Sequence, residues 1–184
     1  MKLNHIAAAA FGALAAFSVS AETTDSGWVK FTGTVTASAC TINASAKNQE
    51  VALGTIPAGR LRNDETSTPV EFTIALESCS YGTVAKLTVS DANKGDTPAA
   101  DLKLANGTNM AEGVAVRVLA QRDGSDYTAI DFTNDSSKTF QLNSGTSDGA
   151  YVAAKFQAQM VASDKDALKA GDVLAQMNYT VEYK

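Results

Sequence analysis

The residues of this chain that could do chemistry are few, and their types exclude most catalytic sites. The only histidine, His5, lies in an N-terminal segment that we expect to be removed, so the mature chain would have none. Ser-His-Asp and Cys-His sites need a histidine as general base, and most zinc sites use one as a ligand. We therefore predict no catalytic residue, no metal site and no cofactor.

The two cysteines, Cys40 and Cys79, are better suited to a structural bond than to chemistry. Their spacing is far from the CxxC of a redox pair, and two thiols without a histidine are too few to hold zinc. An exported protein folds in an oxidising compartment, which favours a disulfide. We expect this bond to close a loop of about 40 residues and, in the chain-entropy view, to stabilise the fold by about 4 kcal/mol.

Three other groups allow a functional interpretation, and a structural one is simpler for each. Asp123 and Asp126 in "RDGSD" lack the ligand spacing and closing glutamate of a calcium loop, and they suit a polar hairpin turn. Arg60 and Arg62 could bind an anion but suit a solvated loop, and Trp28 could stack on a sugar but more often packs beside a strand. A carboxylate pair for sugar hydrolysis stays open, although no acidic residue stands alone within an apolar run.

The N-terminus has the features of an export signal. Lys2 precedes an apolar run of about a dozen residues, which is short of the roughly 20 that a membrane span needs. Val19 and Ala21 then stand where a signal peptidase prefers small residues. We expect residues 1–21 to be a signal peptide cleaved after Ala21, and a membrane anchor is the weaker alternative.

Charge and length restrict the class of protein further. The 184 residues include 15 lysines and arginines against 20 aspartates and glutamates, a formal net charge of −5 at pH 7, and the charges are scattered without runs. Nucleic-acid binding needs basic patches, so we predict no nucleic-acid partner. The length after the signal suits one domain that can bury a core.

Nearly every segment after the signal alternates apolar and polar residues, which is the pattern of strands with one buried face. Clusters of Gly, Asn, Asp and Ser such as "DANKGD" and "NSGTSDG" separate these segments, and we expect residues 164–172 to form a loop. Strands at this spacing favour an antiparallel β-sandwich. The alternating segments are 28–35, 70–76, 85–89, 114–118, 152–160 and 175–183.

The last of these segments raises the question of what covers it. Its apolar residues alternate with Gln176, Asn178, Thr180 and Glu182 almost to the end of the chain. An apolar strand at a sheet edge recruits other chains unless something covers it. We therefore expect a partner for its apolar face, which consists of Ala175, Met177, Tyr179, Val181 and Tyr183.

These features together resemble the major structural subunits of chaperone–usher fimbriae, and are most similar to the type 1 fimbrial pilins of Gram-negative bacteria. The resemblance covers almost the whole mature chain. Members of that family tend to have a tyrosine second from the end, here Tyr183, and a glycine fourteenth from the end, here Gly171. The segments that carry the resemblance are "GWVKFTGTVTASACTI", "EVALGTI", "STPVEFTIALESC", "GVAVRVLAQRDG", "KFQAQMVA" and "AGDVLAQMNYTVEYK".

The resemblance implies an all-β fold, an incomplete immunoglobulin-like β-sandwich that lacks its seventh (G) strand, with an N-terminal donor-strand extension. Residues 22–32 would be the donor arm and residues 33–184 the pilin domain of a subunit in an adhesive surface fimbria. A periplasmic chaperone would complete the fold, and an outer-membrane usher would exchange its strand for the arm of another pilus subunit. The acceptor groove and chaperone contacts would be Gly171, Ala175, Met177, Tyr179, Val181, Tyr183 and Lys184.

Of the two parts of the expected joint, the donor arm and the acceptor groove, the arm matches the family pattern less well. The face that alignment with the family assigns to the groove has two polar residues among five, and a shift by one residue would offer Trp28 instead. A secreted monomeric immunoglobulin-like module that binds carbohydrate or protein through Trp28 or Tyr127 is the alternative function. The assigned donor residues are Thr23, Asp25, Gly27, Val29 and Phe31.

Overall fold

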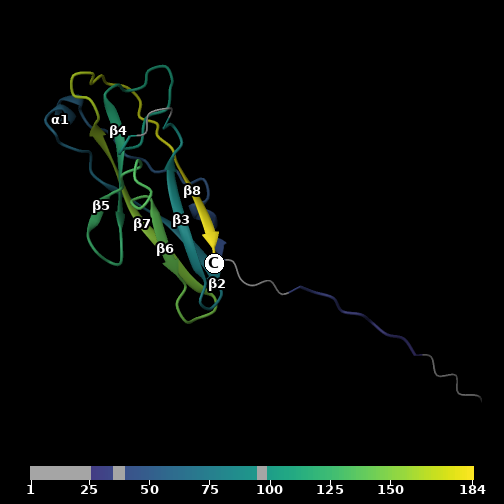
Figure 1. Ribbon diagram of the computed structural model, residues 1–184. Helices are drawn as coiled ribbons and strands as arrows, with labels where there is room; N and C mark the ends of the chain where they lie inside the picture. Colours follow the sequence, from purple (N-terminus) through teal and green to yellow (C-terminus); the bar gives the residue numbers. More distant parts are fainter. Residues whose placement is uncertain (1–25, 35–39, 95–98) are drawn as a thin grey trace, which may run out of the picture. The chain divides into compact units, whose positions relative to one another are not determined.

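The computed structural model describes residues 26–34, 40–94 and 99–184. The chain divides into two compact units, residues 1–35 and residues 36–184 (Figure 1). The described part of the first unit contains neither helix nor strand. The predicted signal peptide lies outside the described residues.

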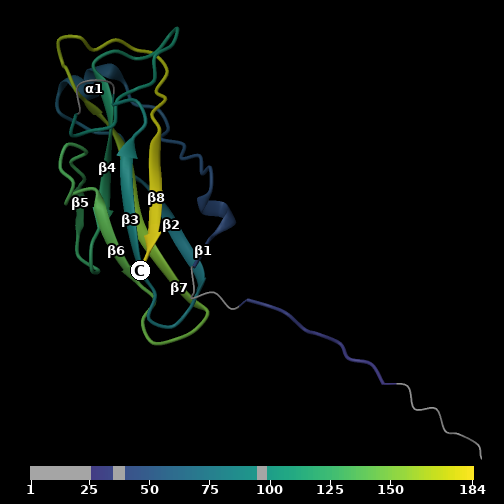
Figure 2. The ribbon, with the colours of Figure 1, turned by 45° about the vertical axis from the view of Figure 1, so that its right-hand side comes forward.

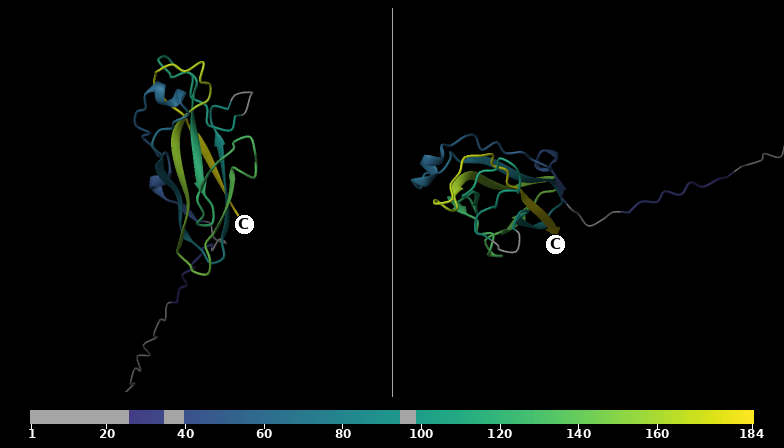
Figure 3. Two further views of the ribbon diagram at one scale, coloured as in Figure 1. Left: turned by 90° about the vertical axis from the view of Figure 1, so that its left-hand side faces the viewer. Right: turned by 90° about the horizontal axis from the view of Figure 1, so that it is seen from above.

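The second unit consists of two antiparallel sheets (Figures 1 and 3). The order is β1-β2-β7-β4-β5 in the five-stranded sheet and β6-β3-β8 in the three-stranded sheet, and each neighbouring pair is antiparallel. The predicted all-β sandwich is therefore confirmed. The elements are β1 (Thr41–Ile42), η1 (Ala44–Ala46), α1 (Ala58–Arg62), β2 (Val70–Cys79), β3 (Val84–Asp91), β4 (Val114–Gln121), β5 (Tyr127–Ala129), β6 (Thr139–Asn143), β7 (Ala150–Ala162) and β8 (Met177–Tyr183).

The alternation in the sequence explains why these segments form strands. In β3, Ala85, Leu87 and Val89 are buried while the residues between them are more exposed. Side chains of a strand point alternately to the two faces of the sheet, so this pattern buries one face. The predicted segments 70–76, 85–89, 114–118 and 152–160 all lie in strands.

The main core lies between the two sheets and is centred on Phe156 of β7, which is fully buried. Its ring stacks on Phe72 of β2 at 5.2 Å between centroids and meets Phe140 of β6 edge-on at 5.3 Å. These three rings come from both sheets, and aromatic pairs in such geometries add stability beyond the area that they bury. These contacts pack the two sheets together along β2 and β7 on one side and β6 on the other.

One predicted strand is absent from the structure. Residues 28–35 were expected to form a strand, but the structure assigns no strand to residues 28–34, and Val35 lies outside the described residues. The exposed fractions of Trp28, Val29 and Phe31 are 83%, 77% and 91%. A strand needs another strand to pair with its backbone groups, and no strand of the described chain pairs with this segment.

Candidate strand-acceptor groove

A groove of about 1320 Å³ runs along the second unit. One wall is the C-terminal segment from Lys169 to Tyr179, and the other is the segment from Ala46 to Ile56 that precedes α1 (Figure 2). The floor is apolar and comes from β2, β4 and β7. Its largest floor residues are Phe72, Ile74, Val116, Val118 and Met160.

The first wall ends in the first residues of the edge strand β8. This strand pairs with β3 from Met177 opposite Asp91 to Tyr183 opposite Ala85, and its other edge has no strand partner among the described residues. The residues that face the core, Met177 and Tyr179 among them, are only half-buried, whereas those between them are exposed. Both the backbone and the inward side chains of this strand are therefore incompletely covered.

The second wall is also unpaired. Within the described chain, residues 48–56 make no backbone hydrogen bond and belong to no sheet. Val51, Leu53 and Ile56 are half-buried, and Leu53 packs against the main core. Backbone N–H and C=O groups in a folded protein are almost always paired, so this wall offers a second row of groups to an added strand.

Two tyrosine hydroxyls of β8 bond carbonyls at the start of the second wall or just before it, at the disulfide end of the groove. Tyr179 donates a hydrogen bond to the carbonyl of Ala46 at 3.1 Å, and Tyr183 donates one to the carbonyl of Cys40 at 3.0 Å. Burial raises the pKa of both hydroxyls above the usual tyrosine value, and Tyr179 raises that of Tyr183 further. Both hydroxyls are therefore neutral donors at physiological pH.

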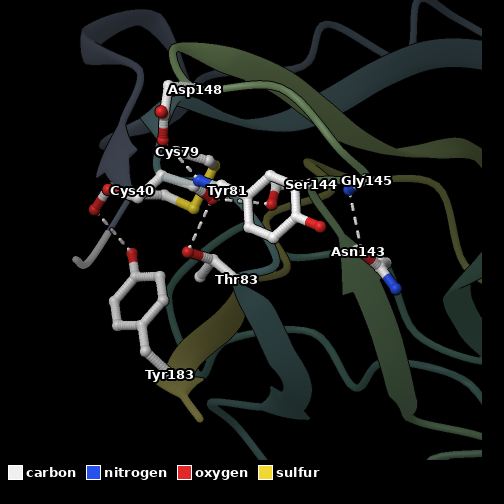
Figure 4. The surroundings of a disulfide bond; sticks show 10 residues. Cys40, Cys79, Tyr81, Thr83, Asn143, Ser144, Gly145, Asp148 and Tyr183 are labelled. Carbon is white, nitrogen blue, oxygen red and sulfur yellow. Dashed lines mark hydrogen bonds between the residues drawn. A yellow bond between two sulfur atoms is a disulfide. The ribbon is translucent and has the colours of Figure 1, made fainter. Parts of the chain in front are cut away.

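The predicted disulfide lies at the same end and is confirmed: Cys40 is bonded to Cys79 (Figure 4). Both cysteines are buried in a small cluster with Leu76 and Ala85, against which Val181 and Tyr183 pack. Since β1 has only two residue pairs with β2, the disulfide is its main attachment to the sheet. It therefore fixes the position of the carbonyl that Tyr183 uses.

Gly171 lies at the other end of the groove, where two chain segments cross. A Cβ atom at this position would be 2.5 Å from the backbone of each of Asn109, Met110 and Ala111. The crossing is held by backbone hydrogen bonds from Ala111 to Asp172 at 2.9 Å and from Asp172 to Asn109 at 2.8 Å. Glycine is needed here because the backbones approach too closely for any side chain.

Replacing Gly171 with alanine is therefore expected to lower the free energy of unfolding by about 1–3 kcal/mol, as overpacking does. The measurement is urea unfolding of the purified subunit. Gly59→Ala is the matched control, because nothing lies within 4 Å of its added Cβ and alanine favours the helix α1. Equal midpoints for both variants would contradict the close approach.

The structure brings only part of the predicted acceptor set to the groove. Ala175, Met177 and Tyr179 line one wall with Gly171 at its end, whereas Val181 and Tyr183 lie beyond the groove, against the disulfide cluster. Lys184 is exposed and donates its backbone N–H to Val84. The predicted loop at residues 164–172 is confirmed.

The predicted donor residues lie either in the first unit or outside the residues that the structure describes. Gly27, Val29 and Phe31 are exposed, and Thr23 and Asp25 fall outside the described residues. The second wall was missed by sequence reasoning. The alternation of Val51 and Leu53 in "EVALGTI" could have predicted this wall, but the segment contributed only to the family resemblance.

Three of the residues considered for function, Arg60, Arg62 and Tyr127, have structural partners. Arg60 binds Glu65 at 2.6 Å, Arg62 donates to the carbonyls of Lys165 and Leu168, and the Tyr127 hydroxyl donates to Glu71 at 3.4 Å. Among the residues that the structure describes, no three metal-ligating side chains cluster. No described helix is long and apolar enough to span a bilayer.

Comparisons with known proteins agree on one family. The family model described as "Fimbrial protein" matches residues 29–184. The chain is 34% identical to the S-fimbrial protein subunit SfaA of Escherichia coli O6:K15:H31, and 31% identical to the type-1 fimbrial protein C chain of Escherichia coli, each over the full length of both chains.

Solved structures show the same fold. A chaperone–usher pilus structure superposes with a TM-score of 0.55 at 21% identity, covering 87% of this chain and 96% of that chain. The P pilus rod subunit PapA gives a TM-score of 0.55 at 18% identity, covering 79% of this chain and 99% of that chain.

Proposed function

This chain belongs to the fimbrial protein family, and from that premise we propose that it polymerises head-to-tail by donating its N-terminal arm to the groove of the next copy. It is a structural subunit of a surface fimbria, exported through the periplasm, and not an enzyme. The resemblance stated from the sequence is thereby confirmed. The strand exchange, its register and its assembly partners are our proposal.

The groove is the observation that supports this proposal. It has an apolar floor, a first wall that ends in an edge strand, β8, with no strand on its second edge in the described chain, and a second wall, residues 48–56, without backbone hydrogen bonds there. An unpaired edge beside apolar side chains is a template for an added strand, whose main chain supplies hydrogen bonds and whose alternate side chains fill pockets. A strand between β8 and residues 48–56 could pair on both sides.

The arm is the segment of the chain that fits this role. Residues 26–34 have bulky apolar side chains exposed to solvent, including Val29 and Phe31. Fully burying one side chain of this size contributes about 1.5–3 kcal/mol. Several such side chains, together with two rows of backbone hydrogen bonds, would give a joint that dissociates slowly.

We assign residues 22–32 as the arm, leading into the pilin domain at residues 33–184. The missing seventh strand of the immunoglobulin-like sandwich is then supplied by the arm. Because the donor and acceptor surfaces differ, such contacts do not close into a ring, and repetition gives a fibre. The residues that would enter the groove are Thr23, Asp25, Gly27, Val29 and Phe31.

The missing seventh strand also indicates which assembly partners the subunit would need. An apolar groove exposed before assembly would aggregate, so a periplasmic chaperone would occupy it first and hold the free carboxylate of Lys184 with basic residues. An outer-membrane usher would then exchange the chaperone's strand for the arm. Lys184 is exposed at the end of β8, where such a partner could reach it.

Deleting residues 22–30 tests the proposal. Wild-type fibres heated mildly in sodium dodecyl sulfate should give a ladder of multimers. The deletion variant should accumulate as a chaperone-bound monomer and form no homopolymer, because its groove is intact but it has no strand to donate.

The control replaces Tyr151, an exposed residue of β7 outside the groove, with alanine. This variant should give the wild-type ladder. Normal fibres from the deletion variant would overturn the assignment of the donor arm.

A further inference from the structure

The two walls of the groove are connected by very little. Among the described residues, the only hydrogen bonds between β8 and residues 40–56 are the two tyrosine bonds, from Tyr179 to Ala46 and from Tyr183 to Cys40. Both lie at the disulfide end (Figure 4 shows the second). Beyond Tyr179, towards Gly171, no described hydrogen bond joins the walls, and the groove is open.

The reach of a tyrosine matches the width that an added strand needs. Neighbouring strands lie about 4.8 Å apart, so a strand inserted between two walls separates them by roughly two such spacings. A tyrosine side chain together with its hydrogen bond extends over a similar length. A tyrosine on one wall that bonds a carbonyl on the other can therefore hold them one strand apart.

We propose that Tyr179, at the end of the groove, and Tyr183, just beyond it, are spacers that hold the empty groove open at the width of a single strand. This inference rests on the proposed function and names positioning residues for it. Neither tyrosine would bind the arm through its hydroxyl, since both hydroxyls already bond carbonyls at the start of the second wall or just before it.

The spacing has to be maintained because the empty groove tends to close. Both walls carry half-buried apolar side chains, including Leu53 on one and Met177 on the other. Bringing them together would remove apolar surface from water, which is favourable. The tyrosine bonds resist this at low cost, because each half-buried hydroxyl has a partner for its hydrogen.

The effect of the spacers should differ before and after insertion. In the empty subunit they are the only described hydrogen bonds between β8 and residues 40–56, so their loss would leave the groove partly closed and slow the capture of a strand. After insertion, the arm itself would bond both walls and keep them apart. Preorganisation of this kind changes the association rate, whereas a merely stabilising contact changes the dissociation rate.

The test uses full-length mature subunits, released from fibres by guanidinium with the disulfide intact and refolded. A fluorescein-labelled peptide of residues 22–34 is added in excess, and anisotropy gives its association rate; a chase with unlabelled peptide gives its dissociation rate. The double variant Tyr179→Phe, Tyr183→Phe should associate about tenfold more slowly, the size expected for loss of two hydrogen bonds. Its dissociation rate should stay within about twofold of wild type.

The matched control is Tyr151→Phe, which removes the hydroxyl of an exposed tyrosine that has no hydrogen bond described. It should leave both rates unchanged. An unchanged association rate in the double variant, or a faster dissociation with normal association, would overturn the spacer role. Should the double variant fail to refold by circular dichroism, each single variant keeps one bond and should still show slower association.

Failure of the proposed function would look different. If wild-type subunits capture no peptide at any concentration, the groove does not accept the arm, and strand donation itself is wrong. If wild type captures the peptide and the phenylalanine variants do so equally fast, only the spacer role is wrong.

Discussion

Replacing Ala175 with aspartate is expected to abolish fibre assembly while the subunit still folds. Ala175 is half-buried and lines the groove, so in the empty subunit the new carboxylate would reach water. Insertion of the arm would cover it without a cationic partner, and burying an unpaired charge costs several kcal/mol. We therefore expect the joint to weaken about a thousandfold or more. The measurement is the multimer ladder of fibres in sodium dodecyl sulfate.

Thr180→Asp is the matched control. It adds the same charge on the exposed face of β8, outside the groove, so it should leave the ladder unchanged. Circular dichroism of both variants as chaperone complexes separates loss of folding from loss of assembly. Intact multimers of Ala175→Asp would show that the inserted strand does not cover this wall.

Removing the disulfide with Cys40→Ser and Cys79→Ser should lower the free energy of unfolding by roughly 4 kcal/mol, the value for a loop of this length. That is a large part of the 5–15 kcal/mol that stabilises a typical domain. The loss should be felt at β1, which has two residue pairs with β2 and no other sheet partner. Urea unfolding of the purified subunit measures it.

Dithiothreitol gives an independent check of the same bond. The reductant should shift the unfolding midpoint of wild type to that of the double serine variant, and should leave the variant unchanged because it has no disulfide to reduce. A difference below about 1 kcal/mol between oxidised and reduced wild type would show that β1 is held by its packing instead.

The strands of the sandwich could be predicted because their side chains meet partners within the same chain. The alternation of Leu87 and Val89, or of Ala154 and Phe156, reports a face that this chain itself buries. The inward face of β8 shows the same alternation, although it is only half covered. Its pattern therefore identified a wall before the groove was visible.

The other features could not be predicted because they depend on which distant segments meet in space. The alternation of apolar and polar residues does not show this. The segment 28–34 has strand-like alternation but no partner, so the same pattern gave a wrong strand. Gly171 was found through family resemblance alone, and the reason for it is the close crossing with residues 109–111. The bonds from Tyr179 and Tyr183 to backbone carbonyls leave no trace in the acceptor residues, because any residue has a carbonyl.

The length of the pairing between β8 and β3 has a mechanical consequence. Seven residue pairs join these strands, from Ala85 opposite Tyr183 to Asp91 opposite Met177. If an arm lies alongside β8, tension along the fibre pulls on the joint parallel to the strands, in shear. All the backbone bonds then share the load, whereas a force across the strands would peel them apart one at a time. A fimbria built in this way would resist the drag of flowing liquid far better than its equilibrium stability alone suggests.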